Sequence, residues 1–273
     1  MTQEISLSML RTLVKERPTD GHKGTFGHAM LIAGSYGMAG ACILAGKGCM
    51  RSGVGKLTIH TPHLNNDIIQ IALPEAIMHH DQDSRVWTSL PRPFSAYSAI
   101  GIGPGIGKSK QTAEALHETL LALNSESIPM VLDADALNIL AEHPEWSSLI
   151  PENTILTPHP LEYRRLTDAG IDMHRLILVL KGHHTTIRIP HHEDTYQCPF
   201  GNNGMGTAGS GDVLTGIILG LLAQGYPPQD AAIMGVSLHA ISGDLASSEL
   251  DPHSLIASDL ITYLPKAFKQ ITK

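Results

Sequence analysis

The feature that most constrains the fold is a repeated order of short apolar segment, glycine-rich turn and helix, which begins at residue 28. Residues 28–34 (HAMLIAG) indicate a buried strand, residues 34–40 (GSYGMAG) its turn, and residues 41–51 a helix of small residues that can pack closely on a sheet. Nearly continuous apolar strands alternating with helices predict a mostly parallel sheet covered by helices on both faces. Further strands are predicted in KLTIHTP, PEAIMHH, YSAIGIG, PMVLD, TILTP and ILVLKGHHTTIRI, the last with two strands around a glycine turn.

Five loops follow predicted strands and therefore lie at one edge of the sheet. In open parallel sheets, ligands bind outside the carboxyl ends of the strands. The sequence thus predicts a site at this edge, with the helices near the end of the chain (residues 211–223, 229–247 and 254–268) as packing elements. The five loops are residues 34–40, 103–107, 133–138, 157–162 and 181–185.

A second constraint is the glycine-rich stretch at residues 201–216 (GNNGMGTAGSGDVLTG), which leads into a strongly apolar helix. A helix N-terminus offers unpaired N–H donors and a partial positive charge, and glycines let a negative oxygen reach them. This pattern favours a phosphate site, with Asp212 as the only charge in the first turn. The alternative is an ordinary turn in which Asp212 simply interacts with the helix dipole.

Other phosphate-binding and hydrolase motifs do not account for this stretch. Gly204, Gly206 and Gly209 match G-x-G-x-x-G, but the strand that should precede the acid about 20 residues further on is missing. No G-x-x-x-x-G-K-[ST] occurs, and Ser210 lacks the spacing of a nucleophile elbow. The P-loop, Rossmann and serine-hydrolase interpretations are therefore excluded.

Composition bounds the organisation and the partners. A chain of 273 residues with 42% hydrophobic residues can build one full core, so we expect one domain over residues 1–273 with its core at about 24–268. A net charge of −7 argues against nucleic acid or an anionic membrane as partner. Cys42, Cys49 and Cys198 form no C-x-x-C pair, which favours a reducing, cytoplasmic location. We expect no signal peptide or membrane span.

Several candidate residues have an ordinary structural explanation. Asp133 follows a strand and could hold a metal or a metal-bound water, whereas Asp135 is expected to cap the next helix. His159 and Glu162 share one face of a helix start, where capping is the simpler explanation. Lys181 ends an aliphatic strand, the usual position of a solvated edge residue. Residues 81–93 are expected to form a surface loop, and the pairs at 79–80 and 191–192 exposed histidine turns; only His159 is a serious histidine candidate.

The motifs taken together are more specific than any one of them. GSYGMAGA, RSGVGKLTIHTP, PEAIM, IGPGIG, VLDADALN, TPHPLE, VLKGHHTTI and GNNGMGTAGSGDVLTGIILGLLAQG occur in this order from about residue 24 to residue 247. In this the chain resembles the ADP-dependent NAD(P)H-hydrate dehydratase family. The resemblance implies a ribokinase-like fold, a three-layer α/β/α sandwich, and an activity that returns hydrated NADH or NADPH to the normal cofactor while consuming ADP or ATP.

The resemblance also implies roles for individual residues. Asp212 would be the catalytic base, and Glu162 would bind Mg²⁺ through water. The family commonly has glycine where Leu161 stands, which bears on the backbone of TPHPLE. The substrate would contact Ala41, Gly105, His159 and Asp212, and the nucleotide would contact Lys181, Gly182, His183, His184, Thr185, Gly209, Ser210 and Gly211.

Hydroxide is a poor leaving group and phosphate a good one, so the resemblance implies phosphorylation of the ring hydroxyl followed by elimination. The residues alone indicate only phosphoryl transfer. Two alternatives remain open: a small-molecule kinase of the same superfamily, which would release a phosphorylated vitamin precursor, and a non-catalytic nucleotide sensor. The resemblance further implies a homotetramer and a separate epimerase in the same pathway. No pattern distinguishes ADP from ATP, or the hydrate of NADH from that of NADPH.

Overall fold

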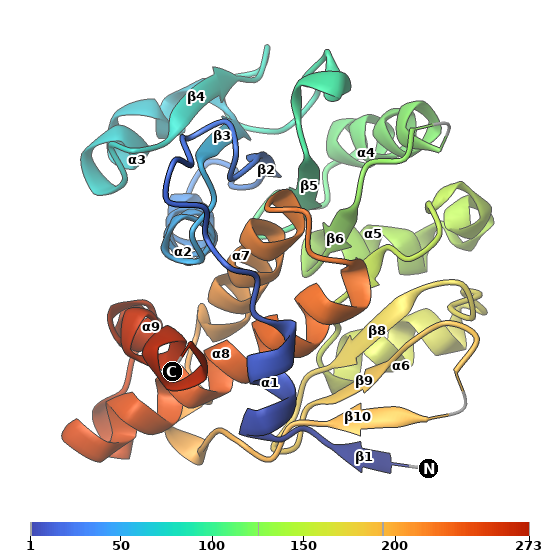
Figure 1. Cartoon of the computed structure of the whole chain (residues 1–273). Helices are drawn as coiled ribbons and strands as arrows, with labels where there is room; N and C mark the ends of the chain where they lie inside the picture. Colours follow the sequence, from blue (N-terminus) through green and yellow to red (C-terminus); the bar gives the residue numbers. More distant parts are fainter. Residues whose placement is uncertain (1, 125, 193, 273) are drawn as a thin grey trace.

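The computed structural model describes residues 2–124, 126–192 and 194–272. In chain order the strands are β1 (Thr2–Glu4), β2 (His28–Ile32), β3 (Lys56–Thr61), β4 (Ile77–His80), β5 (Ala99–Ile102), β6 (Met130–Leu132), β7 (Ile155–Leu156), β8 (Ile177–Leu180), β9 (Thr186–Arg188) and β10 (Thr195–Gln197). They form one sheet in the order β1-β10-β9-β8-β7-β6-β5-β2-β3-β4 (Figure 1). Pairing is parallel from β8 to β4, whereas β9 is antiparallel to both β8 and β10.

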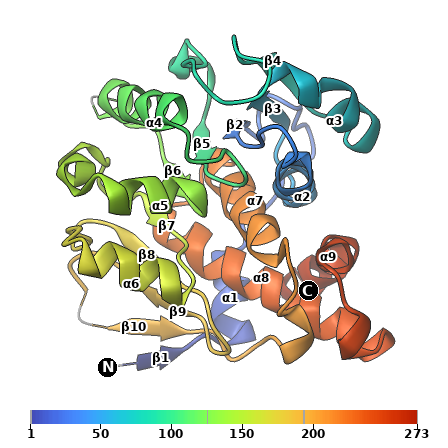
Figure 2. The same ribbon diagram turned by 180° about the vertical axis from the view of Figure 1, so that it is seen from behind.

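Helices cover both faces of this sheet, as Figures 1 and 2 show from opposite sides. They are α1 (Leu7–Leu13), α2 (Ala39–Arg51), α3 (Asn66–Ala72), α4 (Lys110–Leu123), α5 (Asp135–Glu142), α6 (Pro160–Asp168), α7 (Ser210–Ala223), α8 (Pro228–Glu249) and α9 (Ala257–Ile271). Along β2, Leu31 packs into a core shared with α2 and α7, while Met30 and Ile32 pack into one shared with α4, α5 and α6. Alternate side chains of one strand thus serve opposite layers, which confirms the predicted three-layer α/β/α sandwich.

The helix that carries the glycine-rich loop, α7, is fixed by close packing against α2. A Cβ on Gly216 would lie 1.9 Å from the carbonyl oxygen of Ala45, and one on Gly48 would lie 2.6 Å from that of Val213. Only glycine lets the two helix backbones approach this closely. The small residues of α2 therefore serve a packing purpose, as predicted, and they set the position of the first turn of α7.

Two predicted surface features differ in part from the structure. Residues 81–93 form neither helix nor strand, but they fold around the buried carboxylate of Asp81, which accepts hydrogen bonds from the backbone and hydroxyl groups of Thr88 and Ser89. These donors, together with His60, hold the pKa of Asp81 well below its usual range. Trp87 of the same segment is 1% exposed. Part of this segment is therefore buried. It folds around Asp81 because a buried carboxylate needs several hydrogen-bond donors.

The first histidine pair also differs from expectation. The pair at 79–80 lies in β4 rather than in an exposed turn, and the Nδ1 atoms of His60 and His79 are 2.8 Å apart. By contrast, His191 and His192 are exposed in the connection between β9 and β10, as expected. Across the described ranges, no helix combines the length and the apolar character that crossing a bilayer requires.

Candidate active site

The glycine-rich loop ends at the N-terminus of α7, as its sequence predicts. Gly209 is the residue before the helix and adopts a left-handed conformation with φ of 87°. Within the described chain, the N–H groups of Gly209, Gly211 and Asp212 have no hydrogen-bond partner, whereas Ser210 N–H donates to Thr207 at 3.3 Å. Open N–H groups at a helix N-terminus are the usual partners of phosphate oxygens.

Earlier in this loop, Asp244 of α8 holds the chain in place. Its carboxylate accepts hydrogen bonds from Gly201 N–H at 2.8 Å and from Asn202 Nδ2 at 3.0 Å. Asn202 in turn accepts a hydrogen bond from Gly204 N–H at 3.0 Å. The loop is therefore preorganised by side-chain bonds and needs little ordering when a ligand binds.

Lys181 does not behave as a solvated edge residue. Its side chain is 19% exposed, and its Nζ donates to Asp133 Oδ1 at 2.8 Å. The other oxygen of this buried carboxylate accepts the hydroxyl of Thr215, from α7, at 2.6 Å. A Cβ on Gly211 would lie 3.1 Å from Lys181 Nζ, so the ammonium group lies directly against the start of α7. Asp133, whose role the sequence leaves open, thus fixes Lys181 beside the open N–H groups.

Asp212 is half-buried, and neither of its carboxylate oxygens has a hydrogen-bond partner within the part of the chain that the structure describes. Burial and, to a smaller extent, the nearby charge of Asp133 raise its pKa to about 7, and Lys181 opposes the shift. A carboxylate whose pKa lies close to neutrality, and whose oxygens are not engaged, can take up a proton at physiological pH.

His159 and Glu162 form the capping box that the sequence favours. His159 Nδ1 accepts from the N–H groups of Leu161 at 3.1 Å and Glu162 at 3.3 Å, and Glu162 Oε2 accepts from His159 N–H at 2.9 Å. Glu162 is buried, and burial raises its pKa. Leu161, at the position for which the family resemblance implies glycine, lies in the first turn of α6 with an exposed side chain. It therefore fits the helix without requiring glycine.

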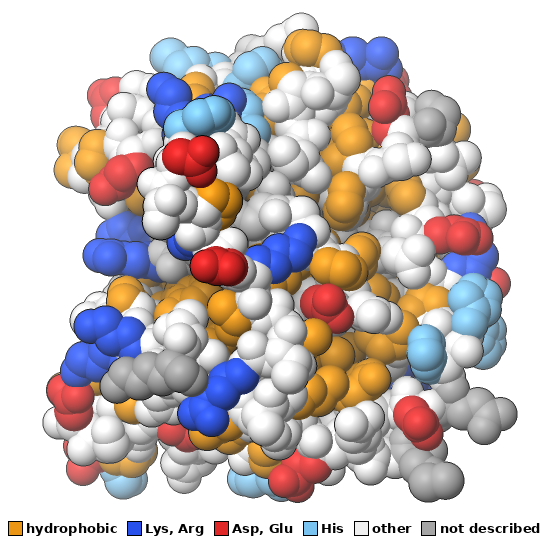
Figure 3. All heavy atoms as spheres, in the orientation of Figure 1, with side chains coloured by type: hydrophobic (Ala, Val, Ile, Leu, Met, Phe, Trp, Pro, Cys, Tyr) orange, Lys and Arg blue, Asp and Glu red, His pale blue; other side chains and the backbone are white. Residues whose placement is uncertain are grey.

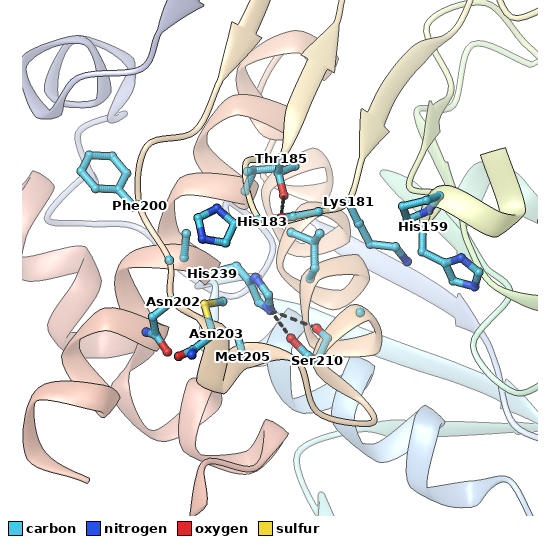
Figure 4. Close-up of a pocket in the computed structure, with 18 residues that line it drawn as sticks. His159, Lys181, His183, Thr185, Phe200, Asn202, Asn203, Met205, Ser210 and His239 are labelled. Atoms are coloured by element: carbon cyan, nitrogen blue, oxygen red, sulfur yellow. Dashed lines mark hydrogen bonds between the residues drawn. The ribbon is translucent and has the colours of Figure 1, made fainter. Parts of the chain in front are cut away.

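A cavity of about 520 Å³ opens beside these groups (Figure 4). Figure 4 shows His159 and Lys181 on one side of it and the glycine-rich loop with His239 on the other. His184 and Gly209, expected with the nucleotide-binding residues, do not line the cavity. The expected residues that do line it are His159, Lys181, Gly182, His183, Thr185, Ser210 and Gly211.

The other three residues expected to bind the substrate, Ala41, Gly105 and Asp212, do not line this cavity. Ala41 and Gly105 lie close to each other. A Cβ on Gly105 would lie 3.2 Å from that of Ala41. Asp135 was expected to be the N-cap of α5, but this prediction is wrong, because Ala134 occupies that position. Its carboxylate instead accepts Gly107 N–H at 2.9 Å, a loop contact that local capping rules cannot reveal. The charge of Asp135 also raises the pKa of Asp212, so these loops lie near the acid.

The cavity also contains residues that sequence reasoning missed. His239 lies on α8, which the sequence suggested only as a packing helix, and its apolar neighbours gave no signal of a site. Residues 200–206 belong to the glycine-rich stretch or adjoin it, but none was assigned a role. The missed lining residues are Pro160, Phe200, Gly201, Asn202, Asn203, Met205, Gly206, Leu214, Val236, His239 and Ala240.

The three-layer sandwich and the glycine-rich loop at the N-terminus of α7 together indicate the class of protein. A ribokinase-like superfamily protein from Enterococcus faecalis V583 superposes with a TM-score of 0.84 at 27% identity, covering 100% of this chain and 97% of that one. The chain therefore has the ribokinase-like fold.

The comparisons also give the family. The family model described as NAD(P)H-hydrate dehydratase matches residues 29–266, and the chain belongs to this family. The ADP/ATP-dependent NAD(P)H-hydrate dehydratase of Bacillus subtilis, co-crystallised with ATP/Mg²⁺, has a TM-score of 0.82 and 34% identity over 97% of each chain. A bifunctional NAD(P)H-hydrate repair enzyme of Coxiella burnetii is 36% identical over 92% of this chain but only 52% of its own length. The chain thus spans about half of that bifunctional relative.

Proposed function

We propose that this chain returns hydrated NADH and NADPH to the normal cofactors by a dehydration that consumes ADP, with release of AMP and phosphate. The observation that carries the proposal is Asp212, a half-buried carboxyl with a pKa of about 7 and no hydrogen-bond partner in the described chain. It lies in the first turn of α7, where open N–H groups meet Lys181. Family membership and the names of the relatives point to the same reaction.

In this proposal the cavity holds the nucleotide. Lys181 and the open N–H group of Gly211 contact its phosphates, and Gly182, His183 and Thr185 contact the remainder. Ser210 N–H is already bonded within the loop, which leaves fewer anion-binding donors than the sequence suggested. The hydrated ring would lie between His159 on one side and Ala41, in the first turn of α2, and Gly105 on the other, with its hydroxyl next to Asp212.

Two steps then complete the reaction. Asp212 accepts the proton of the ring hydroxyl while the hydroxyl oxygen attacks the terminal phosphorus of ADP. The bond between this phosphorus and the oxygen of AMP breaks. The carbon–oxygen bond then breaks and phosphate leaves with the bonding electrons, while the neighbouring ring carbon gives a proton to water and its C–H electrons form the restored double bond. General-base assistance contributes roughly 10²- to 10⁴-fold in such steps, and one anion-hole donor about 10²- to 10³-fold.

The charge balance of the site fits Mg²⁺. The charges of Asp133, Asp135 and Glu162 all raise the pKa of Asp212, and Lys181 is the one cation among the groups that shift it. No group of three His, Cys, Asp or Glu side chains in the described chain could hold a metal ion by itself. This arrangement suits an ion bound mainly by nucleotide phosphates and water, with Glu162 reaching it through water. When bound, the ion would neutralise charge on the transferring phosphoryl group.

We further propose that the chain is a single domain that works as a cytoplasmic homotetramer, with a separate epimerase supplying the correct hydrate. An exposed apolar surface at the β4 edge of the sheet supports self-association, because burying exposed apolar side chains against another subunit removes them from water. Light scattering after size exclusion tests the tetramer. The surface consists of Leu64, Ile68, Ile71 and Ile77.

The test of the proposed reaction supplies the purified chain with hydrated NADH and either ADP or ATP, with and without Mg²⁺. Recovery of the near-ultraviolet absorbance of NADH, with one AMP and one phosphate per turnover when ADP is used, is the expected result. A stable phosphorylated product from a vitamin precursor would instead identify a kinase. Nucleotide binding with no turnover of any candidate would identify a sensor.

A further inference from the structure

His239 connects α8 to the first turn of α7. Its Nε2 is 2.9 Å from the backbone carbonyl oxygen of Ser210 and 3.2 Å from the Ser210 hydroxyl, as the dashed lines in Figure 4 show. A carbonyl oxygen only accepts hydrogen bonds, so Nε2 carries the proton. Burial lowers the pKa of His239 to about 4, which keeps the ring neutral at physiological pH.

The Ser210 carbonyl determines where the next N–H points. In a trans peptide the carbonyl and the N–H that follows it lie in one plane and point in opposite directions. Ser210 and Gly211 begin α7, so Gly211 N–H points toward the open N-terminus of the helix, and His239 holds the Ser210 oxygen on the other side of the same peptide. The space on the Gly211 side is where Lys181 Nζ lies, 3.1 Å from the position of a Cβ. The imidazole hydrogen bond thus adds to the helix geometry in holding the peptide that carries this open N–H of the proposed anion hole.

The other ring nitrogen is open to the cavity. Among the described residues, Thr119 Oγ1 is the only buried side-chain polar atom without a partner. His239 Nδ1 has no hydrogen bond in that part of the chain, so it must be accessible, and the ring is one of the cavity walls. As the unprotonated nitrogen it can only accept a hydrogen bond.

We propose that His239 is a positioning residue of the nucleotide site, holding the Ser210–Gly211 peptide so that Gly211 N–H binds the transferring phosphoryl group. This rests on the function proposed above. The bond from a neutral buried donor to a backbone acceptor requires no change of protonation during turnover. A residue that only filled space between α7 and α8 would need neither a donor at Nε2 nor access to the cavity.

The test compares His239→Leu, which removes the donor, with His239→Gln, whose amide N–H can approach the position of Nε2. We expect His239→Leu to lower kcat about 10- to 100-fold and to weaken ADP binding, measured by calorimetry, about three- to tenfold. His239→Gln should recover a substantial part of both. The matched control is Ser242→Ala, which removes a buried 2.6 Å hydrogen bond to Leu238 on the same helix without reaching Ser210.

A kcat for His239→Leu equal to that of Ser242→Ala would overturn the inference, as would equal loss in His239→Gln and His239→Leu when both are folded by circular dichroism. A failure of the proposed function would give a different set of results from a failure of the inference about His239. In that case the natural chain binds ADP but does not dehydrate the hydrate, and the ADP affinities of the variants still decide whether His239 positions the peptide. Natural chain that binds no ADP would overturn both.

Discussion

Replacement of Asp212 by asparagine separates catalysis from stability. Asn has nearly the same shape as Asp, but it cannot accept a proton, so turnover should fall by at least about 10²-fold. The same change should stabilise the protein above neutral pH. Burial moves the pKa of Asp212 from 3.8 to about 7, which means that the folded chain disfavours the ionised carboxylate. A pKa displacement of this size corresponds to about 4 kcal/mol, and solvent screening of the exposed part reduces it to about 2–4 kcal/mol.

The sign of this effect follows from proton binding. Because the folded pKa is raised, the stability that the protonated carboxyl contributes is fully present below pH 3.8 and is lost as the pH rises through about 7. The asparagine side chain of the variant would be neutral throughout. The difference in free energy of unfolding between Asp212→Asn and the natural chain should therefore be near zero at low pH and grow until neutrality is passed. Urea unfolding at a series of pH values measures it.

The pH dependence of the activity of the natural chain should report the ionisation of Asp212 as well. The base must be ionised, so kcat/KM should rise with pH through about 7 and then level off, unless another group titrates. Asp230→Asn is the matched control, since Asp230 is also a first-turn acid whose pKa is raised by burial, but on α8 and outside the site. Near-normal turnover in Asp212→Asn, or lower stability than the natural chain at alkaline pH, would refute the reasoning.

Three further outcomes are expected. Lys181→Met leaves the 1%-exposed Asp133 carboxylate without its cation, so urea unfolding should show a loss of about 3–5 kcal/mol, and calorimetry should show weaker ADP binding. Gly216→Ala forces a Cβ to within 1.9 Å of the Ala45 carbonyl oxygen and should cost about 1–3 kcal/mol, whereas Gly40→Ala, with open space around it, should be neutral or stabilising by thermal unfolding. EDTA should abolish turnover and leave the circular dichroism unchanged, and Mg²⁺ should restore the activity; persistence of turnover in EDTA would remove the metal from the mechanism.

The order of elements and the glycine-rich loop at the start of α7 could be predicted from the sequence because their signals are local. Apolar runs of strand length, helical periodicity and glycines at the turns are properties of neighbouring residues. The same holds for the start of α7 and for the capping box of His159 and Glu162, whose partners lie three residues apart. The family resemblance extended these signals to a reaction. The residue roles that it implies remain predictions that the experiments above can test.

Predictions from local sequence rules failed where a side chain made its contacts with residues distant in the sequence. Asp135 follows a strand and precedes a helix, yet its carboxylate bonds to Gly107, 28 residues away. Asp81 lies in a polar, proline-interrupted segment that suggests a surface loop, yet it is buried and bonded to His60, 21 residues away. In both cases the carboxylate took hydrogen-bond donors that the tertiary structure brought to it, and for the buried Asp81 these donors offset the loss of water.

The sequence by itself determined that this chain forms a layered α/β protein with an open helix N-terminus and an acid in its first turn. Only the tertiary structure decided what surrounds that acid. Figure 3 shows one face of the molecule, on which hydrophobic, basic and acidic side chains are interspersed. Asp133 meets Lys181 across 48 residues and Thr215 across 82, and His239 reaches Ser210 across 29. Strand order and helix packing create these contacts, and no periodicity encodes them. Burial among them is what moves the pKa of Asp212 to about 7, because desolvation depends on the whole fold rather than on neighbouring residues.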